Sequence, residues 1–125
     1  MATVLTYVGE DWLVQRAAGT GSMSSTTMPY VAWGTDGTTA TKSDTALGAE
    51  SAESRVSGTV TVQGSGSSAV YQNVATITAT ATRAIQEAGI FDASSSGNMA
   101  IHGNFTTINL STDDSIQFTF TLDPS

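Results

Sequence analysis

The chain has 125 residues and a formal net charge of −7, and threonine (21) and serine (16) dominate its composition. This length accommodates one ordinary domain, and the four basic residues are too few to neutralise phosphates, which disfavours nucleic acid as a partner. Cysteine is absent, which excludes disulfides, thiol redox chemistry and thiolate metal sites.

Residues 1–29 are predicted to form an N-terminal arm. Residues 1–8 alternate weakly in hydrophobicity and indicate a short strand or an arm. Residues 9–18 indicate a short helix, because acids precede Trp12 and Leu13, Arg16 lies near the end and Gly19 follows. Residues 19–29 are low in complexity, which predicts a flexible loop.

The N-terminus carries no recognisable targeting pattern. It lacks a basic region followed by an apolar core, so we do not expect a secretory signal. No apolar run approaches the roughly 20 residues of a membrane-spanning helix. We therefore expect synthesis in a cytoplasm and no membrane partner.

Residues 30–125 are predicted to form an antiparallel β domain. Threonine is β-branched and favours strands. Residues 38–53 have no clear period and predict a long irregular excursion anchored by Leu47. Strand patterns separated by turn residues recur at regular spacing, which predicts an all-β sandwich or barrel; they lie at residues 30–34, 56–62, 71–81, 84–92, 99–110 and 116–122.

Two positions predict irregular strands. Gly89 lies inside an apolar run and indicates a bulge or a close approach of the backbone. Ile108 and Leu110 are out of phase with the apolar residues before them, which predicts a bulge near residues 106–107 or a strand that changes sheets.

The polar residues do not form a recognisable catalytic or metal-binding motif. His102 is the only histidine, and a metal site or a catalytic triad needs several convergent groups, so we interpret it as structural or exposed. Asp113 and Asp114 are better explained by a turn than by calcium binding. We therefore expect no catalytic, metal or cofactor residues and no cofactor.

Glu87 is an acid within an apolar strand. Buried charges are normally paired, so we predict a structural ion pair with Arg55, and Arg83 is the second choice of partner. A catalytic carboxylate with a pKa raised by burial is the alternative, although glycoside chemistry would also require a second placed carboxylate.

Large apolar side chains supply the candidate interface anchors, because such residues are enriched at protein contacts as well as in cores. A sugar-stacking platform is the alternative for the three aromatic ones among them. The candidates are Trp12, Leu13, Tyr30, Trp33 and Leu47.

An ordered series of segments over about residues 30–122 resembles small structural proteins of tailed bacteriophages. The strongest parts are Glu-Ala-Gly-Ile-Phe-Asp at 87–92 and Asp-Ser-Ile-Gln-Phe at 114–118. The remaining members are residues 30–35, 44–47, 50, 55–59, 79–86, 105 and 108–110.

The resemblance implies a capsid decoration or cement protein on the exterior of the virion head, synthesised in the cytoplasm of a bacterial host. It implies an antiparallel β-sandwich, jelly-roll-like, with one short N-terminal helix and long loops. The implied partners are the major capsid protein and copies of the chain itself, as a dimer or trimer. In this hypothesis residues 1–29 clasp the shell or sister subunits, and the sandwich over residues 54–122 supplies the rigid body.

Two other functions stay open beside this one. The first is a tail or fibre-associated module that binds the host surface, which loops rich in Ser, Thr and Gly would suit. The second and least favoured is a glycan-cleaving enzyme that uses Glu87 and another acid.

Overall fold

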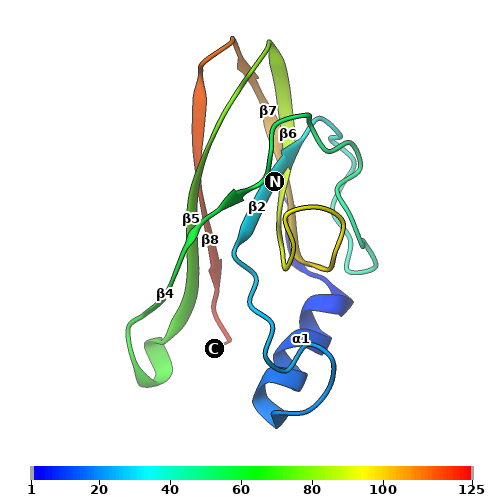
Figure 1. The fold of residues 1–125 in the computed structure, drawn as a ribbon. Coiled ribbons are helices and arrows are strands. Elements are labelled where there is room, and N and C mark those ends of the chain that lie inside the picture. Colours follow the sequence, from blue (N-terminus) through cyan, green and yellow to red (C-terminus); the bar gives the residue numbers. More distant parts are fainter. Residues whose placement is uncertain (1, 125) are drawn as a thin grey trace.

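The computed structural model describes residues 2–124, which form two antiparallel sheets and one α-helix (Figure 1). The two sheets face each other, come together at one end of the molecule and spread toward the end that carries the helix. In chain order the elements are β1 (Ala2–Leu5), α1 (Tyr7–Ala18), β2 (Tyr30–Gly34), β3 (Val56–Ser57), β4 (Thr59–Gln63), a 3-10 turn (Gly66–Ser68), β5 (Val70–Thr78), β6 (Arg83–Phe91), β7 (Met99–Leu110) and β8 (Ser115–Leu122).

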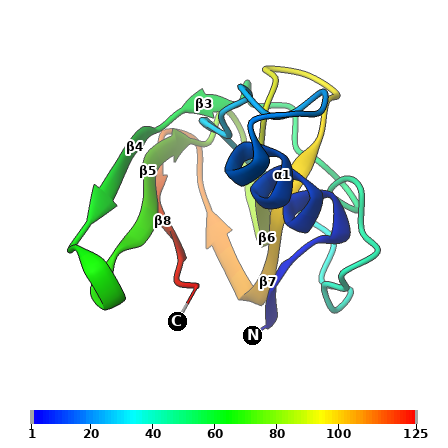
Figure 2. The ribbon, with the colours of Figure 1, turned by 90° about the horizontal axis from the view of Figure 1, so that it is seen from below.

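The sheets differ in size. The larger has the strand order β1-β7-β6-β2-β3 and the smaller has the order β4-β5-β8. Figure 2 shows the three strands of the smaller sheet on one side of the molecule and α1 on the other. The predicted strands at 30–34, 84–92, 99–110 and 116–122 are therefore confirmed to within a residue or two at their ends.

The predicted strand over residues 56–62 is in fact two strands. β3 pairs with β2 in the larger sheet, whereas β4 pairs with β5 in the smaller one. Gly58 lies between them, and a Cβ at this position would collide with Oδ1 of the buried Asn73. The chain thus changes sheets where a missing side chain allows it to pass close over β5.

A common hydrophobic core lies between the sheets. Its members come from both sheets, from α1 and from the segment between α1 and β2. Trp33 of β2 packs edge-to-face against Phe118 of β8, with ring centroids 6.3 Å apart. Trp12 of α1 meets Tyr71 of β5 in the same way at 5.9 Å. Such aromatic pairs add to the stabilisation from burial alone.

The predicted bulge in β7 is confirmed. Ile85 pairs with Ile108 and Glu87 pairs with Asn104, so two steps along β6 correspond to four along β7. The close approach at Gly89 is confirmed as well, since a Cβ there would meet Met99 Sδ at 2.9 Å. The bulge turns the apolar residues on either side of it toward the same core.

The predicted helix is confirmed, and it begins at Tyr7 rather than at residue 9. Thr6 caps it by accepting from the Gly9 backbone N–H at 2.9 Å and donates to the Met99 carbonyl at 2.7 Å. Gly19 ends it in the left-handed conformation. Within residues 2–124, no helix is long and apolar enough to cross a membrane.

The segment predicted as an arm is packed on the rest of the chain. β1 forms an edge of the larger sheet, with Ala2 opposite Asn104 and Leu5 opposite Ile101 of β7. Trp12 is buried in the common core and its indole N–H donates to the Thr26 carbonyl at 2.7 Å. Residues 2–18 therefore belong to the same folded body as the strands.

Candidate functional site

A network of buried polar groups lies on the outer face of the larger sheet, beneath the loop that follows β2. Glu87 on β6 and His102 on β7 point to this face, and Glu87 is fully buried. His102 Nε2 lies 2.9 Å from Glu87 Oε1, and its Nδ1 lies 2.7 Å from Asp44 Oδ2 of the loop. We call Glu87, His102 and Asp44 the acid–histidine network.

The loop backbone donates to the same carboxylate. Gly48 N–H reaches Glu87 Oε1 at 2.9 Å, while the Ala49 and Asp36 N–H groups reach Oε2 at 2.8 and 3.2 Å. Gly34 leaves room for this arrangement, because a Cβ there would meet Glu87 Oε2 at 2.5 Å. With the histidine, each carboxylate oxygen has two hydrogen-bond contacts, so the buried carboxyl group of Glu87 is fully hydrogen-bonded.

His102 joins two carboxylates. Ionised carboxylates only accept hydrogen bonds, so a ring nitrogen that carries hydrogen donates to the carboxylate it faces. Burial raises the pKa of Asp44, but hydrogen bonds from Thr41 and His102 outweigh it and hold that pKa below its ordinary value. The network therefore binds Asp44, and with it the middle of the loop, to the sheet through charge-assisted hydrogen bonds.

The predicted ion pair between Arg55 and Glu87 is wrong. Arg55 makes a bidentate pair with Glu50, at 2.9 Å for both contacts, and its guanidinium lies 3.7 Å from the ring centroid of Phe91. It also donates to the Ala93 and Ser96 carbonyls of the loop after β6. Glu87 and Phe91 are separated by four residues of an extended strand, or about 13 Å, so Arg55 cannot reach both.

Arg83, the second choice of partner, pairs with Glu53 instead, with Arg83 Nε 2.9 Å from Glu53 Oε2. Glu53 also accepts from Trp33, Ser51 and Thr80. Burial raises the pKa of Glu53, but the hydrogen bonds from Thr80, Ser51 and Trp33 outweigh it and hold that pKa far below its ordinary value. Sequence reasoning missed Glu53, since it lies in an aperiodic loop with no local pattern around it.

The geometry of the acid–histidine network indicates a structural role. The adjoining cavity has a volume of about 90 Å³ and is lined by Asp36, Thr38, Asp44 and His102 among others. Glu87 makes four hydrogen-bond contacts within the chain, three with backbone N–H groups of the loop and one with His102. Among residues 2–124, no group of three or more histidines and acids is arranged to hold a metal ion.

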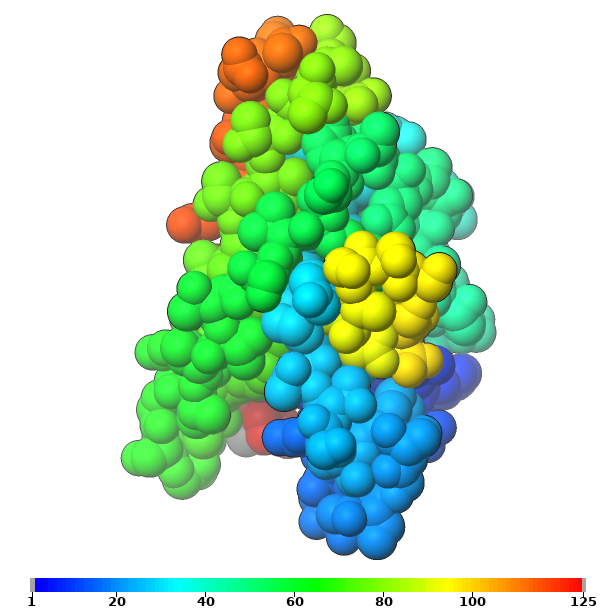
Figure 3. All heavy atoms as spheres, viewed as in Figure 1, coloured from blue at the N-terminus to red at the C-terminus, as the bar shows by residue number. Residues whose placement is uncertain are grey.

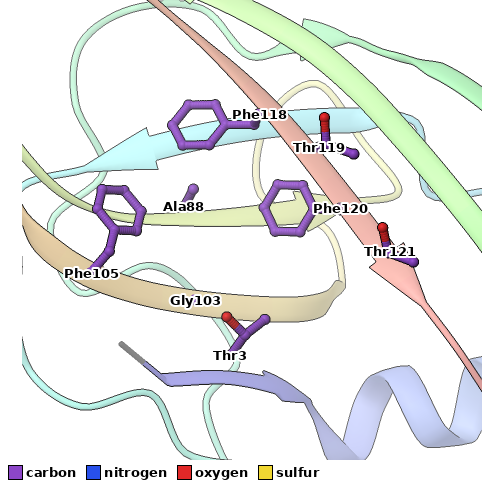
Figure 4. Close-up of a pocket in the computed structure, with 8 residues that line it drawn as sticks. All are labelled: Thr3, Ala88, Gly103, Phe105, Phe118, Thr119, Phe120 and Thr121. Atoms are coloured by element: carbon purple, nitrogen blue, oxygen red, sulfur yellow. The ribbon is translucent and has the colours of Figure 1, made fainter.

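Two apolar hollows lie where the sheets spread apart. The first, of about 200 Å³, separates β8 from β7 and β1, and Phe105, Phe118 and Phe120 line it. Figure 4 shows these rings in the space between the β8 and β7 ribbons, with Thr3 of β1 nearby. We call this hollow the edge slot.

The second hollow lies between α1 and the β4–β5 hairpin and also has a volume of about 200 Å³. In Figure 3, red C-terminal atoms lie between the blue helical region and the green hairpin. Val62, Tyr71 and Leu122 are opposite one another across the three strands, on the face that elsewhere carries the core. Yet Val62 is 74% exposed, because the larger sheet does not extend over it. We call Leu13 and this row the end patch.

The candidate interface residues divide between core and surface. Trp12, Trp33 and Leu47 are buried within the chain, so their surface interpretation is wrong and the core alternative holds. Tyr30 is half-buried and packs on a small second cluster that Leu47 shares with Phe91. Leu13 alone of the five lines one of the two hollows.

Comparisons of this chain with protein-family models, with curated proteins and with solved structures found no match.

Proposed function

We propose that this chain is a non-enzymatic structural protein of a tailed-phage virion, which binds the outer surface of the head and bridges capsid subunits. The observation that carries the proposal is the end patch, an apolar row on the core side of the smaller sheet that the chain covers only in part, since Val62 is 74% exposed and Leu13, Tyr71 and Leu122 are half-buried. An isolated apolar residue on a surface is ordinary, but a continuous patch in a cavity is typical of a contact surface.

The energetics favour association at this patch. Val62 and Val60 are 74% and 40% exposed although both face the core side of the smaller sheet, opposite Tyr71 and Asn73. Covering such side chains removes apolar area from water at roughly 25 cal/mol per Å². A protein that binds only the assembled shell adds that free energy to the assembled state.

The head assignment within this proposal rests on the resemblance of residues 30–122 to phage structural proteins. The partners are the major capsid protein and sister copies, and the finer fold description is a β-sandwich of jelly-roll type, which the eight strands in two antiparallel sheets support. The four hydrogen bonds that hold the buried carboxyl group of Glu87 within the chain support a non-enzymatic protein.

The first test is the copy number of the chain in purified virions, measured by gel densitometry against the major capsid band. A near-stoichiometric ratio is expected for a protein that coats the head. A few copies per particle would contradict the head assignment and favour a tail or fibre module, and absence from the particle would refute a virion role.

A pair of variants then tests the end patch. Val62→Glu places a charge on the patch, and we expect its binding to empty shells to fall by about tenfold or more, since burying an unpaired carboxylate is costly. Thr59→Glu is the matched control, because it adds the same charge to the opposite face of β4. Equal binding by both variants would show that the end patch is not the contact surface.

A further inference from the structure

β8 is an edge strand with an unprotected edge. It pairs with β5 over all eight of its residues, and within residues 2–124 no strand pairs with its other side. Edge strands are normally protected from further pairing by charges, prolines, bulges or short length. β8 carries no charged residue and no proline, and its pairing with β5 is regular from Ser115 to Leu122.

The unpaired edge opens onto the edge slot. Phe118 and Phe120 of β8 point inward, and across the hollow lie Phe105 of β7 and Thr3 of β1 (Figure 4). β1 is itself the terminal strand of the larger sheet, so the unpaired edges of the two sheets flank the same hollow. An added strand would place alternate side chains in the slot and the others in solvent.

The charges around this edge define the partner. Asp113 and Asp114 precede β8 and Asp123 follows it, so carboxylates mark both ends of a neutral strand. None of the four basic residues lies on β1 or β8. A second copy of β8 would bring no basic residue to Asp113 and Asp114, whereas a strand with basic ends would be attracted to them.

We propose that β8 accepts an additional β-strand from a different protein, an extended segment of alternating apolar side chains with basic residues at its ends, which fills the slot between β8 and β1. Backbone hydrogen bonds along β8 supply the affinity, and the apolar slot and the acidic ends supply the selectivity. This inference stands apart from the virion assignment, since it depends only on the edge, the slot and the charges.

The test uses the full chain and a fluorescent synthetic peptide in which valine and threonine alternate between terminal lysine pairs. Binding is followed by anisotropy, and amide hydrogen exchange locates the bound strand. We expect the outward-facing amides of β8 to gain about tenfold protection or more on binding. The same peptide with every backbone amide N-methylated has no N–H group to donate to β8 and is expected not to bind.

Variants of the chain provide the controls. Thr3→Lys places a bulky cation in the slot and is expected to weaken binding by about tenfold, whereas Thr76→Lys, exposed in the middle of the smaller sheet, is not. Replacing Asp113, Asp114 and Asp123 with asparagine keeps residues that suit turns, and we expect it to reduce the salt dependence of binding.

Three results would overturn the inference. Equal binding of the N-methylated peptide would show attraction by charge alone, and protection confined to the β4 edge would place the strand elsewhere. Self-association of the chain that Thr3→Lys abolishes would identify the occupant as a second copy. The virion copy number and the Val62→Glu variant leave all three results unaffected, so the two proposals fail independently.

Discussion

Replacing Glu87 with glutamine tests whether the acid–histidine network holds the loop after β2 on the sheet. The change keeps the shape of the side chain and replaces one acceptor oxygen with an NH₂ group. One orientation sets the NH₂ group against the Ala49 and Asp36 N–H groups. The other sets it against Gly48 N–H, while His102 Nε2 can accept from it when the ring hydrogen is on Nδ1. At least one buried backbone N–H is therefore left without its acceptor in either orientation.

The size of the effect follows from the burial of Glu87. Hydrogen bonds to charged groups contribute about 1.5–3 kcal/mol each, and removing one partner of a buried pair costs about 3–5 kcal/mol. Because the bonds share one carboxylate they do not add fully, and we expect the free energy of unfolding to fall by about 3–5 kcal/mol. This is a large fraction of the roughly 5–15 kcal/mol that stabilises an ordinary domain.

Urea unfolding followed by tryptophan fluorescence measures this loss, because Trp12 and Trp33 are both buried. Glu10→Gln is the matched control, since it makes the same exchange in the half-exposed Glu10–Lys42 pair and should cost less than about 1 kcal/mol. Hydrogen exchange at Gly48 and Ala49 should accelerate in Glu87→Gln and stay unchanged in the control.

Two results would refute this reasoning. If Glu87→Gln unfolds within about 0.5 kcal/mol of the wild type, the network does not stabilise the fold. If the protein is destabilised while exchange at Gly48 and Ala49 stays slow, the carboxylate contributes to stability without holding the loop.

Three further predictions follow from the loop contacts. Arg55→Lys should lower the free energy of unfolding by about 1–3 kcal/mol in urea titrations, because lysine cannot reproduce the bidentate pair with Glu50 or the stacking on Phe91; an unchanged midpoint would contradict this. Gly34→Ala should lower the free energy of unfolding by about 1–3 kcal/mol, because the added methyl group would overlap the Ala49 carbonyl and Glu87 Oε2. An unchanged thermal midpoint would show that the loop can shift to accommodate the methyl group at little cost. Glu53 has a folded-state pKa far below its ordinary value of 4.5, so its stabilisation is complete above that pH and is lost as the pH falls. The free energy of unfolding of Glu53→Gln should therefore be much lower than that of the wild type at pH 7, and the difference should shrink as the pH falls below 4.5. An equal difference at neutral and acidic pH would refute the stabilising role of the ionised Glu53.

Periodic segments could be predicted from the sequence, and residues in aperiodic loops could not. The alternation of Ile116, Phe118 and Phe120 predicted β8, and the phase slip before Ile108 predicted the bulge, since both are local signatures of which face is buried. The break at Gly58 was missed because valines alternate straight through it, and only the position of β5 shows why the chain changes sheets.

The contacts of the candidate site were harder to predict from the sequence, because they too involve loop residues that have no local pattern. Glu87 was identified as a buried acid needing a partner, but its partners are backbone N–H groups and His102, and neither has a sequence pattern. Arg55 was chosen as the partner from the few basic residues of the chain, yet its guanidinium lies over the ring of Phe91. The charge of a side chain predicts that it needs a partner, and only the pairing of strands determines which one it meets.

The pairing of β1 with β7 also constrains when the protein can finish folding. Thr6, which caps α1, donates to the carbonyl of Met99, 93 residues further along the chain. Contacts this distant in sequence close a large loop and form slowly. On the ribosome, β1 and Thr6 emerge well before β7, which carries the strand partners of β1 and the carbonyl that accepts from Thr6. β1 can therefore pair only late in folding. Until the C-terminal strands have been synthesised, the side of α1 that carries Trp12 cannot be buried in the common core.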